Sequence, residues 1–218
     1  MKDIPCVKGR KKIENWVAEG EHLHQDFKFT ISDARKIARS VSAFANAEGG
    51  RLLIGVKDNG VVAGVRNEED IYVVEQAAQR YCSPAVDVTF TAYSYDTNIT
   101  VICAQIPAAQ QRPIQVLEAD GTPRAYYRVA DENIVAHPLM VRAWQYTEPL
   151  SLTADGSLPR LLRLLEQHPD GLDPRTVPIA LHISSARADR LIVQLAAARL
   201  LAFTHTRQGF RLIAAAES

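Results

Sequence analysis

Acidic, basic and imidazole side chains alternate with apolar ones in the segment EHLHQDFKF, residues 21–29. Residues two apart on a β-strand point to the same face, so Asp26 and Lys28 are expected to project together. With further carboxylates, this acid and lysine could hold a divalent ion and orient a water molecule on a phosphodiester. A solvent-facing ion pair is the competing interpretation, because it is the commoner origin of this pattern.

Other residues near this strand could join such a site. His22 and His24 share the polar face and have the spacing of metal ligands, although histidines on a half-exposed strand are more often surface residues. Asp58 ends an apolar strand and could reach the same sheet edge. Glu21 is out of phase with the alternation, so it can contribute only if the chain bends before Leu23.

The sequence around these residues predicts a mixed set of helices and strands. Thr30 and Asp33 are expected to form a capping box for a helix that Gly49 and Gly50 end. The strand that follows is apolar on both faces, which predicts a central position in its sheet. The expected fold class is therefore α+β with a mixed sheet. The further helices are expected at 11–18, 68–81 and 138–146, and the strands at 51–57, 61–65, 86–95, 99–106, 113–117 and 125–129.

The composition shifts in the segment TEPLSLTADGSLP, residues 147–159, which has little periodicity and is typical of a linker. We therefore expect a first domain at 1–147, a linker at 148–157 and a second domain at 158–218. Residues 150–218 contain eight arginines, no lysine and six acidic residues, which also favours a separate domain.

The second domain resembles a winged helix-turn-helix domain: three helices, at 158–167, 173–181 and 186–200, precede two short strands joined by a turn. In such a domain the third helix enters the DNA major groove by its N-terminal part, and the hairpin contacts the backbone or minor groove. A protein-interaction or dimerisation module is the alternative. The expected contact residues are Ser185, Arg187 and Arg190 on the helix, and Arg207 and Gln208 on the hairpin.

The first domain resembles the Schlafen-type AlbA domain through EHLHQDFK, the block AFANAEGGRLLIGV and a later YYRV. Where such a domain is a ribonuclease, the resemblance implies a metal-binding trio of Glu21, Asp26 and Asp58, with Lys28 beside it and Mg²⁺ or Mn²⁺ bound. Two departures weaken this trio: Asp26 replaces the usual Glu, and Lys57 precedes Asp58. The family's ATP-binding label finds no support, since GRLLIGVK lacks the G-K-[ST] of a P-loop.

Cations could form a shallow basic groove beside this strand. If the first long helix lies next to the strand of Asp26, its polar face and neighbouring residues could follow a phosphate backbone. Unrelated cations on solvated faces are the alternative. The residues concerned are Lys28, Arg35, Lys36, Arg39 and Arg128.

Composition excludes several classes of protein. The 25 basic and 25 acidic residues give zero formal charge, which excludes a highly basic nucleic-acid-binding arm. No apolar run approaches the ~18 residues of a membrane span, and residues 1–12 are polar, so we expect a cytoplasmic protein without membrane contact. Cys6, Cys82 and Cys103 are far apart and odd in number, which predicts buried thiols rather than disulfides or a zinc site.

The leading hypothesis is a nucleic-acid-binding, transcriptional-regulator-like protein, with DNA favoured over RNA as partner and a homodimer expected if the DNA site is palindromic. The first alternative is a metal-dependent nuclease that uses the carboxylate trio. The second is a protein-interaction adaptor. No cofactor is predicted for the leading hypothesis.

Overall fold

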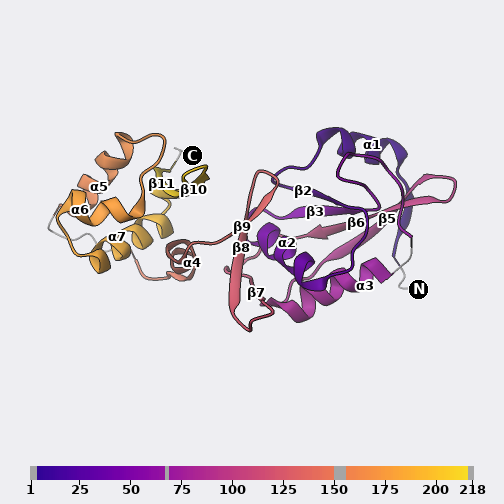
Figure 1. Cartoon of the computed structure of the whole chain (residues 1–218), viewed down its shortest axis with the longest axis horizontal. Helices are drawn as coiled ribbons and strands as arrows, with labels where there is room; N and C mark the ends of the chain where they lie inside the picture. The colour runs from indigo at the N-terminus through magenta and orange to yellow at the C-terminus, as the bar shows by residue number, and fades with distance from the viewer. Residues whose placement is uncertain (1–3, 67–68, 150–155, 216–218) are drawn as a thin grey trace. The chain divides into compact units, whose positions relative to one another are not determined.

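The computed structural model describes residues 4–66, 69–149 and 156–215 (Figure 1). Its contacts divide the chain into two compact units, Met1–Ala136 and His137–Ser218. The expected α+β class with a mixed sheet is confirmed. No helix within the described ranges has the length and apolar character needed to cross a membrane.

The first unit is built on a five-stranded sheet in the order β1-β5-β6-β3-β2. β2 and β3 are parallel, β6 is antiparallel to both β3 and β5, and β1 is parallel to β5. The apolar strand β3 lies inside the sheet, as predicted from its sequence. The bounds are β1 Cys6–Lys8, β2 Gln25–Lys28, β3 Gly50–Ile54, β5 Thr89–Asp96 and β6 Ile99–Ile106.

Helices cover both faces of this sheet (Figure 1). Helix α1 (Arg10–Glu19) packs Ile13 against Phe27 and Leu53 on one face. Helices α2 (Ala34–Asn46) and α3 (Glu69–Gln76) pack on the other face, and α3 continues into a π-helical turn, Ala77–Tyr81. Helices therefore cover both faces of the inner strands, and the first three residues of β2, Gln25–Phe27, are buried.

A second sheet, in the order β4-β7-β8-β9, lies against α2. Asn46 of α2 holds it in place: its amide nitrogen donates to the carbonyl oxygens of Ile114 and Tyr126, and its Oδ1 accepts from Ile114 N at 2.7 Å. The strands are β4 Cys82–Ser83, β7 Gln115–Leu117, β8 Pro123–Val129 and β9 Glu132–Val135.

Several local predictions were wrong. Asp33 alone caps α2, accepting from the backbone N–H groups of Arg35 and Lys36, so the capping box with Thr30 does not form. Residues 61–65 form only a single bridge, Val56 to Val62. Of the three cysteines, Cys6 is exposed rather than buried.

The second unit contains the three helices and the hairpin in the expected order, with one addition. Helix α4 packs on α7, and its Leu139 and Ala143 belong to the same apolar core as Leu191. The first compact unit therefore ends at Ala136, earlier than the expected boundary at 147. The expected linker, 148–157, falls largely on residues 150–155, outside the described part of the chain. The bounds are α4 Pro138–Gln145, α5 Ser157–Glu166, a 3₁₀ turn Pro174–Thr176, α6 Val177–Leu181, α7 Ser185–Ala197, β10 Leu201–Thr206 and β11 Gly209–Ala214.

Candidate nucleic-acid interface

A polar cleft of about 490 Å³ opens in the first unit where β2, α2 and the β8–β9 hairpin meet. The first long helix thus lies beside the strand of Asp26. The predicted basic groove required this arrangement. Four of the five cations predicted for that groove line the cleft, together with three acidic side chains. The lining residues are Asp26, Lys28, Lys36, Arg39, Ser40, Arg128, Asp131, Glu132 and Asn133.

Asp26 is buried at the base of this cleft, with only 5% of its surface exposed. Lys28 Nζ lies 2.8 Å from its Oδ2, and Arg128 Nη2 lies 3.8 Å from its Oδ1. Asp26 therefore forms the ion pair with Lys28, but the alternative interpretation of a solvent-facing pair is wrong, because Asp26 is buried. A buried carboxylate requires compensating charge, and here two cations supply it.

Arg128 is the most buried cation of the cleft, with 1% of its side chain exposed. Its Nη1 donates to Asn133 Oδ1 at 2.9 Å and its Nη2 donates to Gln25 O at 3.1 Å, while its guanidinium stacks 4.8 Å from the Phe44 ring centre. Burial lowers the pKa of Arg128 and the neighbouring Asp26 opposes that shift. The side chain remains a cation, because guanidinium does not deprotonate in proteins.

Arg39, in the wall of the cleft, is also paired with a carboxylate. Its Nε and Nη2 donate to the two carboxylate oxygens of Glu118 at 3.0 and 2.6 Å, and Glu118 accepts a further hydrogen bond from the Tyr126 hydroxyl. The bond from Arg39 lowers the pKa of Glu118, and burial together with Glu118 raises that of Tyr126 to about 12. Sequence reasoning missed Glu118, because only the packing of β7 on α2 brings it to Arg39.

Arg35 does not line the cleft. Its guanidinium lies 4.9 Å from the ring centre of Tyr81, on the π-helical turn. Lys36, one residue further along α2, is exposed and does line the cleft. Residues one apart on a helix differ by about 100° in direction, so adjacent cations of α2 serve different surfaces.

Glu21 reaches Asp26 because the chain turns tightly at His22–Gln25, where the two residues exchange backbone hydrogen bonds. Its Oε1 accepts from Phe27 N at 2.8 Å. Burial and the hydrogen bond with Asp26 raise the pKa of Glu21 from 4.5 to about 7. The bend that sequence analysis required for Glu21 is therefore present, and it brings the Glu21 carboxyl group to Asp26.

Asp58 is exposed in the turn that follows β3. Across residues 4–66, 69–149 and 156–215, no group of three or more His, Cys, Asp and Glu side chains could hold a metal ion. His22 and His24 each face a carboxylate instead, with 3.5 Å to Glu19 and 3.4 Å to Glu48. The metal-binding trio of Glu21, Asp26 and Asp58 remains a prediction.

The AFANAEGG block serves packing. Gly49 has φ +80°, and an added Cβ would lie 2.9 Å from the backbone of Ala108 and of Ile106. At Gly50 an added Cβ would lie 2.3 Å from the ring of Phe44. Together with the buried amide of Asn46, these glycines fix the passage from α2 into β3, as sequence analysis expected.

In the second unit, the predicted contact residues lie at the surface. Ser184 caps α7, and Ser185, Arg187 and Arg190 on its first turns are exposed. Arg207 and Gln208 are exposed at the turn between β10 and β11.

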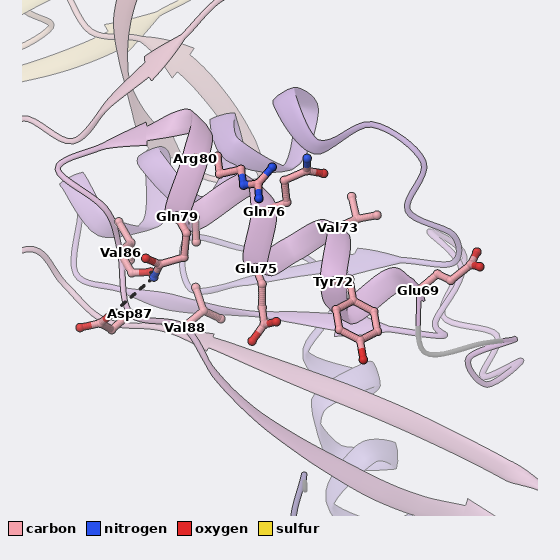
Figure 2. A pocket seen from close by; sticks show the side chains of 11 residues that line it. Glu69, Tyr72, Val73, Glu75, Gln76, Gln79, Arg80, Val86, Asp87 and Val88 are labelled. Carbon is pink, nitrogen blue, oxygen red and sulfur yellow. Dashed lines mark hydrogen bonds between the residues drawn. The ribbon is translucent and has the colours of Figure 1, made fainter. Parts of the chain in front are cut away.

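Another cavity, of about 860 Å³, lies along α3 and the π-helical turn and contains none of the predicted residues. Figure 2 shows Glu69, Tyr72 and Glu75 on α3, with Val88 and Asp87 across the cavity. Arg80 is its one cation against three carboxylates, so its chemistry does not suit a phosphate backbone.

The first unit also matches a known protein family. The family model described as Schlafen, AlbA_2 matches residues 21–137, more than half of the chain. The chain therefore belongs to the Schlafen AlbA_2 family. This membership associates it with a nucleic-acid-related function. No curated protein matches the chain.

Two solved structures are similar at low identity. DIP2311 from Corynebacterium diphtheriae is 19% identical over 92% of this chain, with a TM-score of 0.47, and the chain spans 38% of its length. The N-terminal domain of a RecG-related protein from Nitrosomonas europaea is 20% identical over 61% of this chain and 96% of that domain, with a TM-score of 0.41. At these scores neither likeness supports an inference about function.

Proposed function

We propose that the protein binds nucleic acid, with duplex DNA the favoured ligand, and that it acts as a regulator of transcription. The observation that carries the proposal is the surface of α7. Arg187 and Arg190 are exposed on this helix, while Leu191 and Leu195 anchor it in the core. Arginine pairs well with phosphate and with guanine, and a helix presented in this way can reach either.

The hairpin of the second unit and the cleft of the first unit each add contacts in the proposal. Arg207 and Gln208, at the β10–β11 turn, take the role of a wing that contacts the backbone. In the cleft of the first unit, Lys36 is the exposed cation that can add a phosphate contact, because Arg39 and Arg128 are already paired.

Fluorescence anisotropy with labelled DNA duplex and labelled RNA tests this function. We expect wild type to bind duplex with an affinity that falls steeply between about 50 and 200 mM salt. R187A/R190A should weaken binding at least about tenfold and reduce the salt slope by about 1.8, since each phosphate contact contributes about 0.9. The matched control is R160A/R163A on α5, which removes the same charge from another exposed helix.

The outcomes separate the classes of function. Equal loss in both double variants would contradict a defined contact surface on α7. Absence of binding to DNA and RNA at low salt would overturn the proposal and favour the protein-interaction adaptor.

A metal-dependent nuclease is the second candidate, supported by the contact between Glu21 and Asp26 beside Lys28. Labelled RNA and DNA incubated with and without Mn²⁺ would reveal cutting on a denaturing gel. Asp58→Asn is the decisive variant, because Asp58 is exposed and its substitution should leave the fold intact. Metal-dependent cutting that D58N abolishes would support the trio, and cutting that D58N leaves unchanged would exclude Asp58 from it.

A further inference from the structure

Helix α7 is buried on two opposite faces. Leu191 and Val193 are 4% and 3% exposed, although residues two apart on a helix differ by about 200° in direction. Leu191 faces the core of the unit. Val193 lines a groove together with Arg142 and Gln145 of α4, so α4 lies next to the side of α7 opposite Leu191.

Two polar contacts join α4 and its C-cap to α7. Arg142 Nη1 of α4 lies 3.2 Å from Asp189 Oδ2 of α7, and Gln194 Nε2 donates to the Tyr146 hydroxyl at 2.9 Å. The two contacts are four residues apart at α4, from Arg142 to the C-cap Tyr146, and five residues apart on α7, from Asp189 to Gln194. Helix α4 and its C-cap therefore contact the middle of α7, at Asp189 and Gln194, rather than one of its ends.

This arrangement limits how α7 can meet a DNA duplex. The major groove is about 12 Å wide and one helix with its side chains is about 10–12 Å across. Two packed helices have axes about 8–10 Å apart, so the pair is too wide to enter the groove together. Arg187 and Arg190 remain exposed, but α7 cannot lie deep in the groove along its length.

Helix α4 also brings a cation to this surface. Arg142 lines a groove of about 290 Å³ with Arg190, and it lines an adjoining groove of about 320 Å³ with Ser185. Its side chain is 49% exposed, so its bond to Asp189 is one that solvent and ligands can reach. Neighbouring guanidinium groups in a groove suit the bidentate binding of phosphate oxygens.

We propose, as an extension of the proposed function, that α4 is part of the nucleic-acid-binding surface and that Arg142 is a phosphate ligand. In this arrangement the second unit holds the sugar-phosphate backbone through Arg142, Arg187 and Arg190. Few side chains reach base edges, so binding discriminates weakly between sequences.

The first test measures selectivity. Sequences selected from a random duplex library by the full-length protein are compared with the starting library by competition against one labelled duplex. We expect a preference of less than about tenfold, whereas proteins that read bases reach 10³ or more. A preference of 10³ or more for one sequence would overturn the inference and leave nucleic-acid binding itself in place.

The second test separates a phosphate ligand from a residue that only fastens α4 to α7. Arg142→Gln should weaken duplex binding about fivefold and reduce the salt slope by about 0.9. Asp189→Asn should strengthen binding about twofold or more, because it releases Arg142 and removes a repelling charge. Arg163→Gln on α5 is the charge-matched control, and thermal unfolding checks that each variant is folded.

The outcomes are distinguishable from those of the proposed function. If R142Q and D189N weaken binding equally, Arg142 is no phosphate ligand. The same holds if both leave binding unchanged while R187A/R190A weakens it. In either case the inference fails and the proposed function stands. If wild type binds no nucleic acid, the proposed function and the inference fail together.

Discussion

The cleft of the first unit and the α7 surface of the second both gather arginines, but they hold them differently. In the cleft, Arg128 is 1% exposed and donates to protein oxygens, and Arg39 gives two hydrogen bonds to Glu118. On α7, Arg190 is exposed to solvent. A buried and paired arginine such as Arg128 stabilises the fold, whereas an arginine at the surface such as Arg190 can be reached by a ligand.

This difference teaches that the position of a cation in a groove does not by itself define its role. Removing a buried partner leaves an uncompensated charge, which costs stability. Removing an exposed cation changes little in the folded protein and acts mainly on ligand affinity. The two regions should therefore respond to substitution in opposite ways, in stability for the cleft and in binding for α7.

Arg128→Ala should have the largest effect. It removes a cation beside the buried carboxylate of Asp26 and leaves a void over the ring of Phe44. We expect a loss of about 3–5 kcal/mol in the free energy of unfolding, measured by urea denaturation. Arg124→Ala, which breaks an exposed pair with Asp120, is the control and should change stability by less than about 0.5 kcal/mol. Similar losses in both variants would refute the contrast.

Asn46→Ala should follow. The side chain bonds to Ile114 N, Ile114 O and Tyr126 O, and the substitution leaves these buried groups without their partner. We expect a loss of about 2–3 kcal/mol in the free energy of unfolding. Asn59→Ala, which removes one exposed hydrogen bond to Val61 N, should lose much less. A loss in N46A no greater than in N59A would show that the amide does not fasten the second sheet to α2.

Much of this fold could be predicted from periodicity and turn residues. The central strand, the first long helix, and the three helices and hairpin of the second unit all followed from local patterns. These patterns work because an apolar stripe or an alternation reports which side of an element is buried.

The burial of Asp26 and the placement of α4 could not be predicted in this way. Asp26 is buried because Arg128, from a strand far along the chain, compensates its charge. The stripe in α4 predicts a helix with one apolar face, but it does not say which core that face joins. Both features depend on contacts between distant segments, which the local sequence does not encode.

Glu21→Gln tests the electrostatics of the cleft through pH. The pKa of Glu21 is about 7 in the folded protein and 4.5 without the fold, so the folded state binds the proton more tightly. Its contribution to stability is fully present below about pH 4.5 and is lost as the pH rises through 7. Because Glu21 is partly exposed, we expect wild type to lose only about 1 kcal/mol relative to E21Q between pH 5 and 8. Parallel urea curves at the two pH values measure it, and an equal pH dependence in both proteins would contradict the raised pKa.

Lys36→Gln should have the smallest effect on stability and sharpens the comparison most directly. Lys36 is the cleft cation that is exposed, so it should behave like an arginine of α7 rather than like Arg128. We expect a change of less than about 0.5 kcal/mol in unfolding, with duplex affinity lowered about threefold and the salt slope reduced by about 0.9. Lys11→Gln, on the exposed side of α1, is the charge-matched control. If both variants bind like wild type, the cleft makes no contact with nucleic acid, and the binding surface is confined to the second unit.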